Sequence, residues 1–234
     1  MSAPTIDHVR LQRTVEEAAL DLEGAPALEV LSWATEEFGS GWCVASSMED
    51  AVLPHLASRA MPGVDVIFLD TGYHFTETLG TRDAVAATLP VTIKTITAPQ
   101  SVVEQIAELG PNLFSRNPNR CCALRKVAPL ATALEPYIAW ASGLRRDEAV
   151  TRRSVRVVEW DAKRSMVKLN PIAAWTQADV DAYIAENGVL VNPLLSDGYG
   201  SVGCAPCTRR LAPGQSARDG RWAGQSKTEC GLHD

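Results

Sequence analysis

The chain carries two pairs of closely spaced cysteines, and thiols placed in this way can hold a metal ion or a redox group. Cys121 and Cys122 are adjacent, and much further along the chain Cys204 and Cys207 are separated by two residues. A disulfide between neighbouring cysteines strains the backbone, and the N-terminus does not resemble a secretion signal. Three interpretations remain open: a four-cysteine iron–sulfur cluster, a structural zinc ion, or thiols buried in the core.

Both cysteine pairs lie in basic stretches of an acidic chain. The 234 residues have a net charge of −6, and residues 1–70 hold twelve acids against three arginines. By contrast, the stretch 116–126 has three Arg and one Lys with no acid, and 201–228 has four Arg and one Lys against a single Asp. A thiolate-bound cluster is anionic, so cations beside it lower its electrostatic cost. The general basic excess of nucleic-acid-binding proteins is missing, and we therefore expect a small anionic ligand near the cysteines.

The C-terminal sequence Lys227-Thr-Glu-Cys230-Gly-Leu-His233-Asp holds a further cysteine. Cys230 lies in a Gly-rich segment and is a poor core residue, so it is a candidate reactive thiol. Lys227 and His233 are near enough in sequence to favour its thiolate. The alternative is an idle thiol in a frayed tail. Cys43, in an apolar segment, is expected to be a small core residue.

Strand and helix patterns alternate along the middle of the chain. We expect helices at 5–23 and 26–38, then strands at 41–45, 64–69, 91–96 and 137–141 separated by helices near 51–61, 75–88, 100–109 and 122–134. An irregular loop is expected at 112–120, a hairpin within 153–169, a helix beginning at Thr176, and little regular structure after 192. This order predicts an α/β fold with a doubly wound, mostly parallel sheet and an irregular C-terminal segment.

Small, polar or basic segments follow three of the predicted strands, where ligands bind in such sheets. These segments are Ser46-Ser47, Asp70-Thr71-Gly72 and Ser142-Gly143-Leu-Arg-Arg146. Turn residues also follow strands for structural reasons, so a ligand role and a structural role both remain open. Ser46 and Ser47 could cradle a phosphate or cap the next helix.

Five motifs occur together and in a fixed order. They are Cys121-Cys-x-x-Arg-Lys126, Gly143-Leu-Arg-Arg-Asp147, Gly203-Cys-x-x-Cys-Thr208, Gly220-Arg-Trp222 and the ending Lys227-Thr-Glu-Cys-Gly-Leu-His233. From about residue 30 to its end, the chain resembles the adenylyl-sulfate (APS) reductases, the iron–sulfur branch of the phosphoadenylyl-sulfate (PAPS) reductase family. The family's phosphate loop often reads Ser-x-Ser-Gly, whereas Val44 and Ser47 stand here at its first and last positions.

The resemblance implies an adenine nucleotide α-hydrolase-like fold and a [4Fe–4S] cluster on Cys121, Cys122, Cys204 and Cys207. It implies one reductase domain over 1–234, with N-terminal helices at 1–38, a nucleotide-binding core at 39–190 and a cluster-binding, catalytic segment at 191–234. The implied contacts are phosphosulfate at Ser46, adenosine at Leu69, Thr71 and Gly143, and phosphosulfate or phosphate at Arg152, Arg218 and Arg221. The match to the family leaves the choice between Arg152 and Arg153 open by one position. Lys126 would lie between cluster and substrate, and Cys230 would be the nucleophile with His233 beside it.

The implied reaction is the thioredoxin-dependent reduction of adenosine 5′-phosphosulfate to sulfite and AMP through an S-sulfonate on Cys230, in sulfate assimilation and cysteine biosynthesis. Three alternatives remain: the same chemistry on PAPS, an ATP-dependent adenylating sulfur-transfer enzyme, or a zinc-stabilised nucleotide-binding protein without catalysis. The expected partners are APS and thioredoxin, with a possible homo-oligomer and neither nucleic acid nor membrane. The apolar runs are too short to span a bilayer, and the expected location is the cytoplasm.

Overall fold

The computed structural model describes residues 7–225 and 227–233, and these residues form an α/β fold around one sheet. The described strands are β1 (Trp42–Ala45), β2 (Asp65–Asp70), β3 (Thr92–Thr97), β4 (Ala139–Ser142), β5 (Val158–Asp161) and β6 (Met166–Leu169). They lie in the order β3-β2-β1-β4-β6-β5. Every neighbouring pair is parallel except β5 and β6, which form an antiparallel hairpin at one edge. The predicted mostly parallel sheet and the predicted hairpin are both confirmed.

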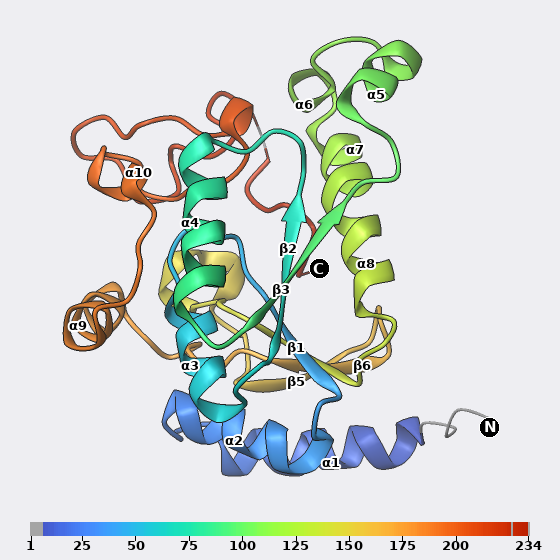
Figure 1. Ribbon diagram of the computed structural model, residues 1–234, viewed down its shortest axis with the longest axis vertical. Helices are drawn as coiled ribbons and strands as arrows, with labels where there is room; N and C mark the ends of the chain where they lie inside the picture. The colour runs from blue at the N-terminus through green and yellow to red at the C-terminus, as the bar shows by residue number, and fades with distance from the viewer. Residues whose placement is uncertain (1–6, 226, 234) are drawn as a thin grey trace.

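The strands bury both faces, because alternate residues of a strand point to opposite sides of the sheet. In β1, Trp42 and Val44 belong to a large apolar cluster with helices of the N-terminal half. Cys43 points the other way, into a smaller cluster with Trp140 of β4 and Leu130. Helices therefore cover both sides of the sheet, as the doubly wound prediction requires (Figure 1). The expectation that Cys43 is a core residue is also confirmed.

Most predicted helices are present with small shifts at their ends. The longer ones are α1 (His8–Asp21), α2 (Ala27–Phe38), α3 (Val52–Ala60), α4 (Thr76–Thr88), α5 (Val102–Leu109), α8 (Ala128–Leu134) and α9 (Gln177–Asn187). Thr176 caps α9 in a reciprocal capping box with Asp179, as its side chain suggested. The first two residues of the helix predicted at 5–23 lie outside the described residues. Within the described part of the chain, each helix is too short or too polar to cross a bilayer.

The irregular loop predicted at 112–120 is wrong, because this stretch forms two short helices. They are α6 (Leu113–Arg116) and α7 (Pro118–Cys122), and the side chain of Asn117 accepts a hydrogen bond from the backbone of Arg120 at the start of α7. Proline at the first position of a helix costs nothing there, so Pro118 starts α7 instead of preventing it. A π-helical turn, Ala123–Val127, then joins α7 to α8.

The strand order reverses between β1 and β4, and this point fixes where a ligand crevice forms. The chain runs outward from β1 through β2 to β3, and then returns to place β4 on the other side of β1. In open α/β sheets the crevice lies beyond the carboxyl ends of the strands at such a reversal. Ser46 follows β1 and Gly143 follows β4, so both flank this crevice. The C-terminal segment contributes short turns, namely α10 (Pro193–Ser196) and the 3₁₀ turn Ala205–Cys207.

Candidate active site

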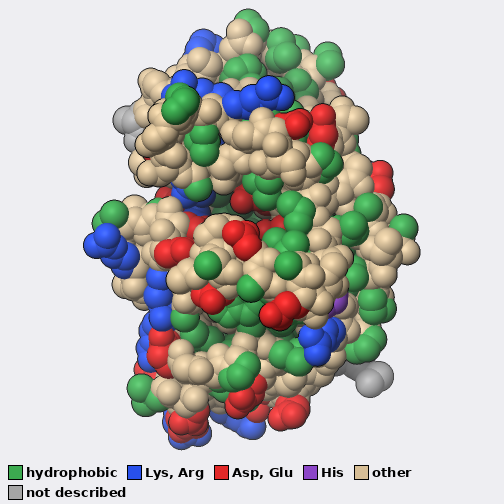
Figure 2. All heavy atoms as spheres, turned by 90° about the vertical axis from the view of Figure 1, so that its left-hand side faces the viewer, with side chains coloured by type: hydrophobic (Ala, Val, Ile, Leu, Met, Phe, Trp, Pro, Cys, Tyr) green, Lys and Arg blue, Asp and Glu red, His purple; other side chains and the backbone are tan. Residues whose placement is uncertain are grey.

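A cavity of about 770 Å³ lies beyond the carboxyl ends of β1 and β4. Its wall includes Ser46, Gly143, residues of α9 and α10, and the C-terminal residues Cys230 and His233. This volume is in the range of small-molecule sites. Seen from the side of α9 and α10, the surface is hollowed at mid-height, with acidic and basic side chains at the edge of the hollow (Figure 2). The topology and the cavity therefore identify the same ligand site.

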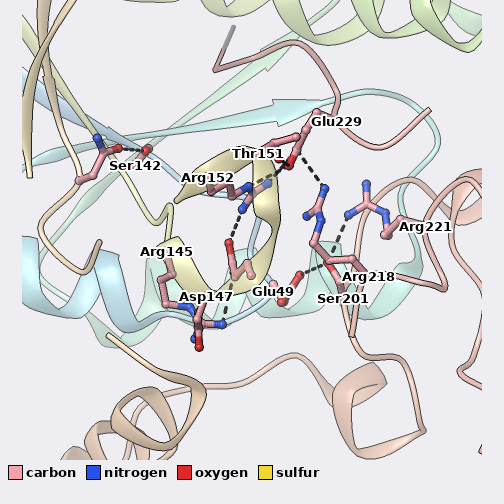
Figure 3. A network of polar contacts seen from close by, with 12 residues as sticks. Glu49, Ser142, Arg145, Asp147, Thr151, Arg152, Ser201, Arg218, Arg221 and Glu229 are labelled. Carbon is pink, nitrogen blue, oxygen red and sulfur yellow. Dashed lines mark hydrogen bonds and ion pairs between the residues drawn. The ribbon is translucent and has the colours of Figure 1, made fainter. Parts of the chain in front are cut away.

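Besides Arg145, four cationic side chains line this cavity together with the Cys230 thiol. They are Lys126, Arg152, Arg218 and Arg221. Arg152 comes from the 3₁₀ turn Val150–Arg152, and its side chain is buried except for 11% of its surface, whereas the neighbouring Arg153 is exposed. Figure 3 shows Arg152 near the centre of a polar network, with Arg218 and Arg221 to one side of it. A cavity with several cations beside a thiol suits a polyanionic ligand.

Gly203 allows Arg221 to reach this cavity. A Cβ atom built on Gly203 would lie 2.2 Å from Nη2 of Arg221, which is far closer than atoms can approach. The guanidinium therefore passes over the glycine, with its carbon 4.6 Å from the centre of the Trp222 ring. The Gly203-Cys-x-x-Cys motif therefore requires glycine at its first position for a steric reason, because a side chain there would collide with Arg221.

The four paired cysteines line one further pocket, which adjoins the cavity. Cys121 and Cys122 come from α7 and Cys204 and Cys207 from the C-terminal segment, and the wall also includes Thr71 and Trp222. Burial, then the neighbouring Cys122, Cys204 and Cys207, raise the pKa of Cys121 to about 12. Burial and then Cys204 raise the pKa of Cys207 to about 11. The thiols therefore lie close enough to oppose one another's ionisation.

This set of donors fits an iron–sulfur cluster by its chemistry. Among residues 7–225 and 227–233, no three His, Cys, Asp or Glu side chains are grouped so as to hold a metal ion. A cluster places a separate iron at each thiolate, so its four ligands need not converge on one point. The irons would also supply the positive charge that four adjacent thiolates need.

Lys126 lines both the cysteine pocket and the large cavity. It lies in the π-helical turn that follows Cys122, and such turns are frequent at functional sites. Burial alone would lower the pKa of Lys126, but the nearby thiols, Cys204 and Cys230 foremost, raise it. Lys126 is therefore a cation between the cysteine pocket and the ligand cavity, and its position between cluster and substrate stays a prediction.

The predicted ligand residues at the ends of β1 and β2 do not all lie in the same pocket. Leu69 lines the large cavity, and its carbonyl oxygen lies 2.8 Å from Nε2 of His74. The Thr71 side chain is turned to the cysteine pocket, with its hydroxyl 3.3 Å from Sγ of Cys204. The Ser46 hydroxyl accepts a hydrogen bond from the backbone of Met48, and it is Asp50 that accepts one from Val52 in the first turn of α3. Ser46 is thus free of the helix-capping role that was its alternative.

The C-terminal segment is docked on the sheet. The His233 ring stacks on Trp140, and the Leu232 carbonyl accepts a hydrogen bond from Nη2 of Arg164. Burial, then Lys168 and nearby arginines, hold the pKa of His233 well below its usual value. A neutral imidazole cannot attract a thiolate by charge, so stacking is the contribution the geometry gives His233. Lys227 donates to Asn119 at 2.6 Å.

Sequence reasoning missed the acidic side of the site. Glu229 pairs with Arg152 and Arg218, and Glu49 accepts hydrogen bonds from the Ser201 hydroxyl and the Val202 backbone (Figure 3). Burial raises the pKa of Glu49, although the Val202 backbone opposes this. Glu229 could have been noticed as a neighbour of Cys230, whereas Glu49 gave no signal.

Taken together, the fold and site define a nucleotide-binding α/β protein with a thiol-lined pocket and a C-terminal cysteine in the adjoining ligand cavity. The chain matches the phosphoadenosine phosphosulfate reductase domain over residues 42–210, and it belongs to that family. A protein of Streptomyces coelicolor named adenosine 5′-phosphosulfate reductase is 63% identical over 95% of this chain and 94% of its own. One of the same name from Mycolicibacterium smegmatis is 54% identical with the same coverage.

Solved structures support the same fold. The crystal structure of a phosphoadenylyl-sulfate reductase from Candida auris, in complex with phosphate, superposes with a TM-score of 0.71 at 26% identity, over 89% of this chain and 100% of that one. An FMN adenylyltransferase from Candida glabrata shares the fold alone, with a TM-score of 0.55 at 11% identity, over 89% of this chain and 76% of its own. The adenine nucleotide α-hydrolase-like prediction agrees with these likenesses.

Proposed function

We propose that the chain reduces adenosine 5′-phosphosulfate to sulfite and AMP, with Cys230 as nucleophile and a thioredoxin as reductant. The observation that carries this proposal is the placement of Cys230 in one cavity with Lys126, Arg152, Arg218 and Arg221. A thiolate approaching a phosphosulfate is repelled by its negative charges. These four cations offset that repulsion and stabilise the charge that develops on the leaving phosphate.

The reaction balances in two steps. The Cys230 thiolate attacks the sulfur of the phosphosulfate, the bond from sulfur to the bridging oxygen breaks, and AMP leaves with the electron pair. This leaves an S-sulfonate on Cys230. A thiolate of the dithiol then attacks the Cys230 sulfur and expels sulfite, and the second thiol resolves the mixed disulfide. The dithiol is oxidised to a disulfide, and Cys230 returns as a thiol.

The [4Fe–4S] cluster is part of the proposal, held by Cys121, Cys122, Cys204 and Cys207. The four thiols and the cations next to them support this assignment. When bound, the cluster would tie α7 to the C-terminal segment and contribute to the field at the substrate, without a change of oxidation state. Lys126, which lines both pockets, would orient the sulfate group by its charge.

APS rather than PAPS is the proposed substrate, because relatives that match nearly the whole chain at 63% and 54% identity carry the APS reductase name. The PAPS reductase of known structure is more distant, at 26%. An adenylating activity has no use for Cys230 in the cavity, so the alternative is not favoured. The proposal includes a cytoplasmic location, because cytosolic reductants keep thiols reduced.

Trapping of the intermediate tests this function. The protein is incubated without thiol with APS or, separately, with PAPS, and the mass of the C-terminal peptide is measured. We expect a sulfonate on Cys230 with APS, and none with PAPS or in Cys230→Ser. An adduct formed only with PAPS would change the substrate. If neither compound modifies cluster-containing protein, the reductase proposal is wrong.

A further inference from the structure

Glu229, the residue before Cys230, occupies the place where the proposed function puts the substrate's anionic group. Its carboxylate accepts hydrogen bonds from Nε and Nη2 of Arg152, at 2.9 and 2.8 Å, and from Nη2 of Arg218 at 3.0 Å. The Thr151 hydroxyl donates a further one at 3.3 Å. Figure 3 shows Glu229 between the two guanidinium groups. A group of the chain itself therefore occupies the arginines assigned to the phosphosulfate.

Arg152 has little capacity left for a second anion. Its Nε and Nη2 edge binds the Glu229 carboxylate in a bidentate manner, and its third nitrogen, Nη1, contacts Glu148. A planar guanidinium presents one such edge to one carboxylate or phosphate at a time. The substrate cannot use this edge of Arg152 while Glu229 holds it.

The electrostatics also indicate that Glu229 and the substrate compete for these arginines. Burial alone would raise the pKa of Glu229, but the hydrogen bonds and charges of Arg152, together with Arg218, lower it. Glu229 is therefore a carboxylate at neutral pH. A phosphosulfate placed on the same two arginines would meet this carboxylate at short range, and the repulsion between like charges in a partly buried site is strong.

The residues after Cys230 are attached by groups other than Arg152 and Arg218. Arg164 donates from Nη2 to the Leu232 carbonyl at 3.0 Å, and His233 stacks on Trp140. Displacement of Glu229 would therefore loosen the chain before Cys230, where Arg218 still binds the Thr228 carbonyl and Lys227 binds Asn119, and leave the residues after Cys230 anchored. The thiol would move within the cavity and would not leave it.

We propose that Glu229 is a positioning residue that fills the anion subsite on Arg152 and Arg218, and that the substrate's phosphosulfate displaces it. Substrate binding then moves Cys230 about the anchored end, and the thiol turns toward the sulfur only when that sulfur is present. This inference rests on the proposed function and adds the residue that couples binding to the movement of the nucleophile.

Residue-resolved hydrogen exchange tests the displacement on iron-containing Cys230→Ser protein, which binds substrate without turnover. We expect APS to accelerate exchange of the backbone amides around Glu229 while the amide of His233 keeps its rate. Adenosine, which lacks the anionic group, should change neither. In Glu229→Gln on the same background, exchange around residue 229 should be fast before substrate is added. APS should bind this variant about tenfold more tightly, since no carboxylate competes.

Two controls separate the outcomes. Glu37→Gln, an exposed position on α2, removes the same charge and should leave APS affinity unchanged. Glu148→Gln removes a carboxylate from Arg152 outside the C-terminal segment, and APS should still accelerate exchange around Glu229 in this variant. Slower exchange around Glu229 on APS binding, or unchanged or weaker affinity in Glu229→Gln, would overturn the displacement and leave the reductase proposal standing. Failure of the parent protein to bind APS would overturn both.

Discussion

The ring of His233 stacks on the ring of Trp140, with centroids 5.7 Å apart and planes 5° from parallel. The guanidinium of Arg164 and the ammonium of Lys168 lie 5.4 and 5.6 Å from the centre of the same Trp140 ring. One aromatic side chain of β4 thus attaches the end of the chain to the sheet, next to the arginines of the cavity. The position of Cys230 depends on this attachment.

Acidification should weaken the attachment of the C-terminal segment. His233 is held neutral by burial, then by Lys168, Arg152, Arg164 and Arg218, so its pKa when docked is lower than when released. The free energy of docking is then fully present above the ordinary histidine pKa of about 6.5 and is lost as pH falls below it. We expect faster proteolysis of the segment near pH 5.5 than near pH 7.5, after correction for the protease's own pH dependence.

His233→Phe is the matched control, because phenylalanine stacks and does not titrate. Its segment should keep the same susceptibility at both pH values. Glu229 does not interfere, since its pKa is lowered and it stays ionised across this interval. Equal pH dependence in the parent and in His233→Phe would contradict the assignment to His233.

Arg164→Gln should release the end of the chain and slow the reaction of Cys230. The variant loses the charged donor to the Leu232 carbonyl and the ion pair with Asp161. A hydrogen bond from a charged donor is worth about 1.5–3 kcal/mol, so we expect a fall in kcat/KM of about tenfold or more. Arg153→Gln, at an exposed position in the same half of the chain, should have little effect. An Arg164 variant with parent kinetics and parent exchange rates at residues 231–233 would contradict this role.

The sequence predicted the fold well because its central strands β1, β2 and β4 are short apolar runs bounded by turns, and this pattern depends on local residues alone. The prediction of a loop at 112–120 was wrong because Asn and Pro residues of this stretch, including Pro118, lie at the starts of helices. The local sequence around a proline can be the same at the start of a helix and in a loop. Tertiary packing decides which of the two structures forms.

The site was predictable only in part. Basic residues close to cysteines in sequence, such as Lys126, lie close to them in space. The pairing of Glu229 with Arg152 could not be predicted, because it joins residues 77 positions apart, one in a 3₁₀ turn and the other in the irregular C-terminal segment. The same holds for Thr71 and Cys204, which are 133 positions apart. Contacts of this kind follow from the fold and leave no local signature.

Removal of any one of the paired cysteines should abolish iron binding. Cys121→Ser and Cys204→Ser take away one thiolate each from opposite sides of the cysteine pocket. Iron and acid-labile sulfide assays on the purified variants should show their loss. Cys43→Ala is the control, since Cys43 lies in the core away from this pocket and should keep full iron content. Zinc in place of iron in the parent protein would contradict the cluster assignment.

Lys126→Ala should lower activity strongly without loss of the cluster. The lysine lines the cavity and the cysteine pocket, and it is not one of the proposed cluster ligands. Removal of a buried cation that faces an anion costs about 3–5 kcal/mol, so kcat/KM should fall by at least about a hundredfold. Lys126→Arg, which keeps the charge, should recover part of the loss. Parent-like activity of Lys126→Ala at unchanged iron content would exclude the proposed role.

Gly203→Ala should weaken substrate binding through Arg221 and not through the fold. The added methyl group would meet the guanidinium of Arg221 at 2.2 Å, and the far end of a flexible side chain can move away at small cost. The free energy of unfolding should therefore change little, while the KM for APS rises because one cation has left the cavity.

A double-mutant cycle with Arg221→Ala tests the mechanism. If the methyl group acts by displacing Arg221, the double variant should bind APS no more weakly than Arg221→Ala alone. Additive losses would show that Gly203 acts on another group, with the adjacent Cys204 as the first candidate, and iron content measured on the same samples would reveal that.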